Sequence, residues 1–208
     1  MSTDQSSEMI IAALRQQLVE KENELQTLRL EIDSLVRHDA LTGVMNRRTL
    51  IEMLNAELQR SHRTGHPFCF AIIDLDHFSL VNEQFGTETG DRVLKTVSDA
   101  SIKLLRVLDR FGRLGGEEFG IVLPATWLDS GLIALTRLRA AVAACDWATI
   151  TPGTEITFSA GMTTNATADT PELMIERAEK ALLQAKQEGR NRTATLEEAL
   201  PDMPMFDD

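Results

Sequence analysis

The sequence predicts an α/β domain in which helices flank a central, mostly antiparallel sheet. Three observations predict it. Apolar runs of strand length alternate with longer amphipathic runs along the chain. Two of the short runs are joined by a Gly-Gly turn, which is typical of a hairpin. The composition, 43% apolar and 25% charged over 208 residues, is that of a globular protein with a substantial core.

The first segment of the chain repeats apolar residues at alternating spacings of three and four, which is the a/d pattern of a coiled coil. A helix with this pattern has no globular core to cover, so we expect it to pair with a second copy in a parallel dimer. Lys21 interrupts the apolar seam. The alternative is a single amphipathic helix folded back on the domain. The seam residues are Ile11, Leu14, Leu18, Leu25, Leu28, Ile32 and Leu35.

The rest of the chain divides into alternating elements. Asn46 is the expected N-cap of a helix that runs to about His62. Pro171 marks the start of the last helix and Gly189 follows its end. The other expected elements are strands over 68–74, 110–114, 119–123 and 155–162 and helices over 91–108 and 128–145. We therefore divide the chain into a dimerising helix (1–37), an α/β domain (38–195) and a flexible acidic tail (196–208).

Charge and cysteine usage exclude several classes of function. The net charge of −11 argues against a nucleic-acid-binding protein, which normally presents a basic face. No apolar run is long enough to cross a bilayer and no signal peptide is recognisable, so we expect a cytoplasmic protein without a membrane segment. Cys69 lies within an apolar run and is expected in the core, and neither a disulfide framework nor a zinc site is expected for the two cysteines.

The residues most suggestive of chemistry follow the strand predicted over 68–74. Asp74-Leu75-Asp76 places two carboxylates at a partly dry strand end, where their repulsion is costly unless a cation neutralises it. Mg²⁺ accepts one or two carboxylates together with waters and substrate phosphates. The alternative is a solvated acidic loop, which is common at strand ends.

A second acidic pair stands at the predicted hairpin, in Gly115-Gly116-Glu117-Glu118. Alone it is an ordinary turn. If the hairpin lies beside Asp74, several carboxylates converge, as in metal-dependent phosphoryl or nucleotidyl transfer. Lys186 and Arg190 add local positive charge after the last helix, although cations there also simply complement the helix dipole.

From about residue 38 to 195 the chain resembles the GGDEF-family diguanylate cyclases, in a variant with Glu at the central acidic position of the signature. The resemblance depends on several separate motifs in the family's order and spacing. They are Asp39 to Arg48, Asp74 to Phe78, Asn82, Gly90-Asp91, Arg113 to Phe119, Ala181-Leu182, Lys186 and Gly189 to Asn191.

The resemblance implies a nucleotidyl-cyclase, ferredoxin-like palm and a reaction in which two GTP molecules form cyclic di-GMP and two pyrophosphates. Asp74, the carbonyl of Leu75 and Glu117 would hold Mg²⁺, with Mn²⁺ as an alternative. Glu117 is the family's usual base for the 3′-hydroxyl, although metal activation can deprotonate that group without a dedicated base. Asp74 and Glu118 are the other residues expected to be catalytic.

The resemblance also implies substrate-binding and inhibitory residues. Asn82 and Asp91 would read guanine, and Lys186 and Arg190 would grip the triphosphate. The expected nucleotide contacts further include Phe78, with the backbone amides around it, and the hairpin glycines Gly115 and Gly116. Product inhibition by cyclic di-GMP would use three residues near the end of the helix predicted over 91–108 and on the following helix: Arg106, Asp109 and Arg137.

Three positions depart from the family's usual residues: Ser79 replaces Lys, Thr87 replaces His and Leu183 replaces Tyr. Ser79 removes a cation near the phosphates, which predicts weaker GTP binding. The departures keep a second hypothesis open, in which a catalytically weak domain binds GTP or cyclic di-GMP as a signalling module.

Overall fold

The structure, a computed structural model, describes residues 15–28 and 36–198. It divides into two units, Met1–His38 and Asp39–Asp208. In the first unit, residues 15–28 are helical, and the seam residues Leu18, Leu25 and Leu28 are exposed in the single chain. The remaining predicted seam residues and most of the predicted tail lie outside the described residues, so the coiled coil stays a prediction.

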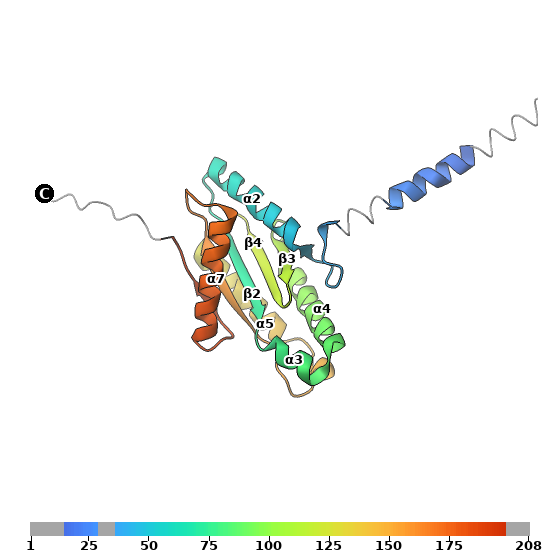
Figure 1. The fold of residues 1–208 in the computed structure, drawn as a ribbon. Helices are drawn as coiled ribbons and strands as arrows, with labels where there is room; N and C mark the ends of the chain where they lie inside the picture. The colour runs from blue at the N-terminus through green and yellow to red at the C-terminus, as the bar shows by residue number, and fades with distance from the viewer. Residues whose placement is uncertain (1–14, 29–35, 199–208) are drawn as a thin grey trace, which may run out of the picture. The chain divides into compact units, whose positions relative to one another are not determined.

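The second unit is built on one six-stranded sheet with the order β1-β3-β4-β2-β5-β6 (Figure 1). The central pairs β3/β4, β4/β2 and β2/β5 are antiparallel, whereas the outer pairs β1/β3 and β5/β6 are parallel. The predicted mostly antiparallel sheet is therefore confirmed. The strands are β1 (Met45–Asn46), β2 (Cys69–Leu75), β3 (Arg110–Gly115), β4 (Glu118–Leu123), β5 (Phe158–Thr164) and β6 (Thr193–Thr195).

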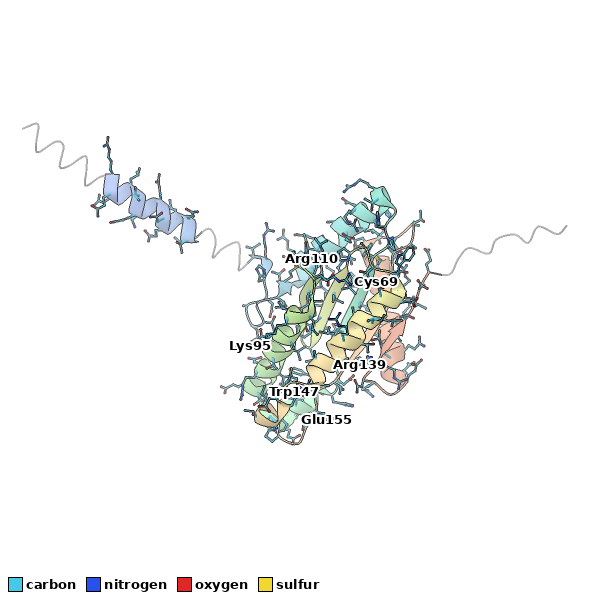
Figure 2. The ribbon with its side chains drawn as sticks, turned by 180° about the vertical axis from the view of Figure 1, so that it is seen from behind. Cys69, Lys95, Arg110, Arg139, Trp147 and Glu155 are labelled. Carbon is cyan, nitrogen blue, oxygen red and sulfur yellow. The ribbon has the colours of Figure 1, made fainter. Side chains whose placement is uncertain are left out.

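Helices cover both faces of this sheet. Helices α2 (Arg47–Thr64) and α7 (Pro171–Gln187) lie over the face seen in Figure 1. Helices α4 (Thr87–Leu104) and α5 (Leu128–Ala143) cover the opposite face, which is turned toward the viewer in Figure 2. The short helices α3 (Phe78–Phe85) and α6 (Trp147–Ile150) contribute to the core of that second layer.

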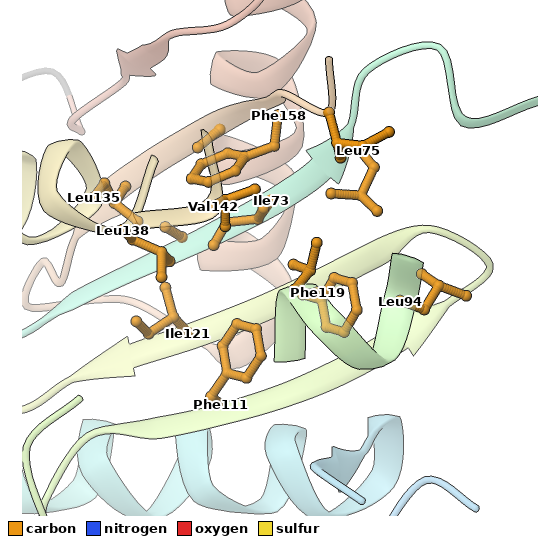
Figure 3. Close-up of a cluster of buried hydrophobic side chains, with 14 of the residues drawn as sticks. Ile73, Leu75, Leu94, Phe111, Phe119, Ile121, Leu135, Leu138, Val142 and Phe158 are labelled. Atoms are coloured by element: carbon orange, nitrogen blue, oxygen red, sulfur yellow. The ribbon is translucent and has the colours of Figure 1, made fainter. Parts of the chain in front are cut away.

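Strand β2 is buried along its whole length because both of its faces are covered. Ile73 and Leu75 pack with residues of α4 and α5 (Figure 3), whereas Phe70 and Ile72 pack with residues of α2 and α7. Cys69 is fully buried, as expected, and burial raises the pKa of its thiol to about 12. The alternation places Asp74 on the α2/α7 side of the sheet.

Most predicted elements are present with shifted ends. The side chain of Asn46 accepts a hydrogen bond from the Thr49 amide at the start of α2, as predicted. Helix α4 ends at Leu104 and not at Leu108, because Asp109 accepts a hydrogen bond from the amide of Arg106 and closes a turn there. The sequence prediction missed α3, α6 and the edge strands β1 and β6. Among the described residues, no helix is long and apolar enough to span a membrane.

Candidate active site

The predicted acidic residues meet where β2 ends beside the β3–β4 hairpin. Asp74 is directly opposite Glu118 of β4 in the antiparallel register. The amide of Leu75 donates a hydrogen bond of 3.4 Å to the carbonyl of Glu117, which holds the hairpin tip against the strand end. The structure therefore brings Asp74, Leu75, Glu117 and Glu118 together.

The charges at this strand end are imperfectly balanced. Lys186 of α7 places its Nζ 2.8 Å from Oδ2 of Asp74. Burial nevertheless raises the pKa of Asp74, since the ion pair with Lys186 only partly offsets the loss of water and the repulsion from Glu117 and Asp76. Burial also raises the pKa of Glu118, and the nearby Asp74 carboxylate adds to that increase. Two carboxylates are thus held in surroundings that disfavour their negative charge.

This environment fits a divalent cation, which would relieve the repulsion. Asp74 and Glu117 offer carboxylate oxygens, and the backbone carbonyl of Leu75 stands at the same strand end. Within the described residues, no three His, Cys, Asp or Glu side chains form a complete metal-binding group. The predicted set requires only two side chains, because Mg²⁺ commonly takes its other oxygens from water and substrate phosphates.

Asp76, the second carboxylate of the predicted acidic pair, has different neighbours. Its side chain is 6% exposed and accepts hydrogen bonds from Thr157 and Ser159, both at 2.7 Å. The two aspartates of the pair are therefore used differently: Asp74 lies with the hairpin glutamates and Lys186, and Asp76 is satisfied by hydroxyl groups.

The hairpin tip is open above its two glycines. Gly116 has a left-handed φ of 50°, and a Cβ on Gly115 or Gly116 would have no described residue within 4 Å apart from its neighbours in the chain. Arg113 holds the tip in place, because its Nε and Nη2 donate hydrogen bonds of 2.9 and 2.8 Å to the Gly116 carbonyl. The same guanidinium reaches Asp39, with Nη1 3.2 Å from Oδ1. Arg113 and Asp39 belong to motifs of the sequence, but no role was predicted for either residue.

The residues expected at the guanine base lie on α3 and α4. Asn82 packs so closely on Gly90 that a Cβ there would stand 2.0 Å from Oδ1 of Asn82. Asp91 is the next residue and is exposed. The Phe78 ring is buried. Its backbone amide belongs to the first turn of α3, where helix amides lack intrahelical partners, so the amide and not the ring is the group left for a ligand contact.

Arg190 is exposed in the turn after α7 and has a left-handed φ of 63°. Its amide donates to the Ala185 carbonyl at 3.0 Å, which ties the turn to the end of the helix that carries Lys186. Lys186 and Arg190 are therefore both placed by the C-terminal end of α7, as the sequence suggested.

The three residues predicted to bind product line one cavity of about 350 Å³ between the end of α4 and α5. Arg106 and Asp109 come from the turn that ends α4, and Arg137 is exposed on α5. Apolar side chains complete the walls, including Leu105 and Ile133. The cavity thus combines two guanidinium groups and a carboxylate with apolar surface.

A mixed sheet flanked by helices, with carboxylates gathered at a strand end and the adjacent hairpin, is the palm of the nucleotidyl cyclases. Residues 36–192 match the family model described as "Diguanylate cyclase, GGDEF domain". The chain belongs to the GGDEF domain family.

Known proteins agree with this assignment. The chain is 45% identical over 154 residues to the diguanylate cyclase DgcP of Pseudomonas aeruginosa. The matched region covers 74% of this chain and 23% of DgcP. It resembles the coiled coil and GGDEF domain of Caulobacter crescentus DgcB in complex with c-di-GMP, with a TM-score of 0.77, 25% identity and coverage of 88% and 99% of the two chains. The active GGEEF domain of a Vibrio cholerae diguanylate cyclase gives a TM-score of 0.69, 30% identity and coverage of 74% and 99%.

Proposed function

We propose that this chain is a Mg²⁺-dependent diguanylate cyclase that condenses two GTP molecules into cyclic di-GMP and two pyrophosphates. The observation that carries the proposal is the meeting of Asp74 with Glu117 and Glu118 beside Lys186. The chain spans only 23% of the length of DgcP and 34% of that of the response regulator PleD of Caulobacter vibrioides, so the proposal concerns the domain described above.

In each of two successive steps, a 3′-hydroxyl oxygen of one GTP attacks the α-phosphorus of the other, pyrophosphate leaves, and the hydroxyl proton passes to a base. Glu117 is the candidate base on the open hairpin tip. Asp91 accepts hydrogen bonds from guanine, and the amide of Asn82 can accept or donate there. Lys186 and Arg190 neutralise phosphate charge. Bound Mg²⁺ would lower the pKa of the attacking hydroxyl and stabilise the developing charge.

Because each subunit holds one GTP, two sites must face each other. We assign the pairing to the N-terminal helix, whose seam residues Leu18, Leu25 and Leu28 are exposed. Two such helices would bury this apolar surface against each other. The dimer that results would raise the local concentration of one half-site at the other.

The cavity that contains Arg106, Asp109 and Arg137 is the proposed inhibitory site for the product. Guanidinium groups bind phosphates and guanine acceptors, and Asp109 can accept from guanine donors. Strand β3 leads from this turn to the hairpin, so product bound here would lie about 20 Å along the strand from the catalytic glutamates. The proposed location is the cytoplasm, in keeping with two free cysteines.

The decisive experiment is incubation of the purified chain with GTP and Mg²⁺, with cyclic di-GMP and pyrophosphate measured separately. We expect one cyclic dinucleotide for every two pyrophosphates and a specific activity that rises with protein concentration. ATP in place of GTP serves as the substrate control, and Glu117→Gln as the catalytic control. Nucleotide binding without product at any protein concentration would instead support the non-catalytic signalling module.

A further inference from the structure

Asp76 is a buried carboxylate that the proposed reaction does not use. It follows β2 directly, and its side chain is 6% exposed. Its oxygens accept hydrogen bonds from three groups of the protein. Thr157 Oγ1 and Ser159 Oγ donate at 2.7 Å each, and the backbone amide of Asn191 donates at 3.1 Å. A buried charge is tolerated when donors satisfy it in this way.

These donors belong to separate parts of the chain. Ser159 lies on β5 and Thr157 just precedes it, whereas Asn191 lies in the turn after α7. Asp76 also donates its own amide to the Thr157 carbonyl at 2.9 Å. One side chain therefore ties the end of β2 to the start of β5 and to the turn that carries Arg190.

That turn needs support from its surroundings. Arg190 and Asn191 have left-handed φ values of 63° and 48°, an arrangement that non-glycine residues rarely adopt twice in succession. Such a conformation persists when neighbouring groups hold it. The Asn191 amide is held by Asp76, and the Arg190 amide by the Ala185 carbonyl.

We propose that Asp76 is a positioning residue for substrate phosphate: by accepting the Asn191 amide, it fixes the turn from which Arg190 reaches the triphosphate. This inference rests on the proposed function, in which Arg190 binds GTP. Asp76 and Asp74 then have separate tasks, although only one residue stands between them. Asp74 belongs to the cation-binding cluster, whereas Asp76, apart from the repulsion that its charge adds at Asp74, acts on the substrate through Arg190.

Two variants of Asp76 distinguish the loss of its hydrogen bonds from the loss of its charge. Asp76→Asn can keep every contact, because its carbonyl oxygen can accept from Asn191 and Thr157 while its amide donates to the Ser159 hydroxyl. Asp76→Ala loses the side-chain hydrogen bonds with Thr157, Ser159 and Asn191. The probe is a non-hydrolysable GTP analogue with saturating Mg²⁺, measured by calorimetry, together with KM and kcat for GTP where turnover is detected.

We expect Asp76→Ala to weaken analogue binding and raise KM about 10-fold, with kcat within about 3-fold of wild type. Asp76→Asn should stay within about 3-fold for both quantities. In an Arg190→Ala background, Asp76→Ala should add less than about 2-fold, because the residue through which it acts is already gone. If Asp76→Ala fails to fold, the double variant Thr157→Val/Ser159→Ala replaces it, with a smaller loss that also disappears without Arg190.

Three results would overturn the inference. Asp76→Asn could weaken analogue binding as much as Asp76→Ala does, or Asp76→Ala could have its full effect in the Arg190→Ala background. The third is an Asp76→Ala variant that needs more Mg²⁺ for half-saturation, as Asp74→Asn would. The binding readout separates this inference from the proposed function. A wild-type chain that binds the analogue and makes no cyclic di-GMP refutes the cyclase and leaves the Asp76 comparison valid. A wild-type chain that does not bind the analogue refutes both.

Discussion

Asp39 and Arg113, 74 positions apart in the chain, form an ion pair of 3.2 Å that joins the first residue of the second unit to the base of the β3–β4 hairpin. The guanidinium simultaneously holds the Gly116 carbonyl. Asp39 in turn accepts from the amide and hydroxyl of Thr42. The hairpin tip is thus anchored to the segment that directly follows the N-terminal helix in sequence.

Breaking this pair should loosen the hairpin and destabilise the domain. Both side chains are largely buried, so we expect Asp39→Asn to cost about 1–3 kcal/mol of unfolding free energy at pH 7 and to lower cyclase activity. The matched control is Glu52→Gln, which breaks the exposed pair with Arg48 and should cost less than about 0.5 kcal/mol. Denaturant titrations measure both, and equal costs would contradict the anchoring role.

The same pair predicts a pH dependence of stability. Burial alone would raise the pKa of Asp39, but the hydrogen bonds from Thr42 and Arg113 outweigh it and lower the pKa. The ionised form is therefore favoured in the folded state. Its contribution is complete above the unfolded pKa of about 3.9 and is lost as pH falls below it. The stability difference between wild type and Asp39→Asn should shrink from pH 6 to pH 2, and a constant difference would exclude this linkage.

Asp74→Asn should separate function from stability. Because burial and neighbouring carboxylates raise the pKa of Asp74, its ionised form weakens the metal-free fold at neutral pH. We expect Asp74→Asn to melt at a higher temperature than wild type without Mg²⁺ and to lose about 100-fold or more in activity with it. Added Mg²⁺ and GTP analogue should raise the melting temperature of wild type only. A variant that melts lower than wild type in metal-free buffer would refute the electrostatic argument.

Arg106→Ala should relieve product inhibition. Arg106 lines the cavity with Asp109 and Arg137, so its loss would remove one of the proposed contacts to product phosphate or guanine. We expect the cyclic di-GMP concentration for half inhibition to rise at least about 10-fold. The control is Lys103→Ala, which removes a neighbouring exposed cation of α4 that does not line the cavity. Equal shifts in the two variants would show a general charge effect and not a site.

A charge placed on the heptad seam should impair the dimer. Leu25→Glu puts a carboxylate at a seam position, whereas Val19→Glu makes the same kind of change beside the seam on the same exposed helix. We expect Leu25→Glu to raise the dimer dissociation constant, measured by sedimentation, and to lower activity per subunit most at low protein concentration. Equal effects of the two substitutions would contradict coiled-coil pairing.

Local patterns were sufficient for much of the fold. Pro171 and Asn46 marked helix starts correctly because capping involves only neighbouring residues. Helix α3 was missed, since its 8 residues, about two turns, are too few for a periodic apolar signal. The end of α4 was placed too late because apolar periodicity continues to Leu108, while the Asp109 side chain closes a competing turn.

The sequence by itself determined the alternation of elements, the buried strand that carries Asp74 near its end and the glycine hairpin with its two glutamates. These features depend on residue type and local spacing. Tertiary structure alone decided which side chains meet, because contacts such as Asp74 with Lys186 or Asp76 with Asn191 join residues more than 100 positions apart. Sheet register and helix packing set those contacts, so two aspartates that look equivalent in the sequence have different neighbours in the fold.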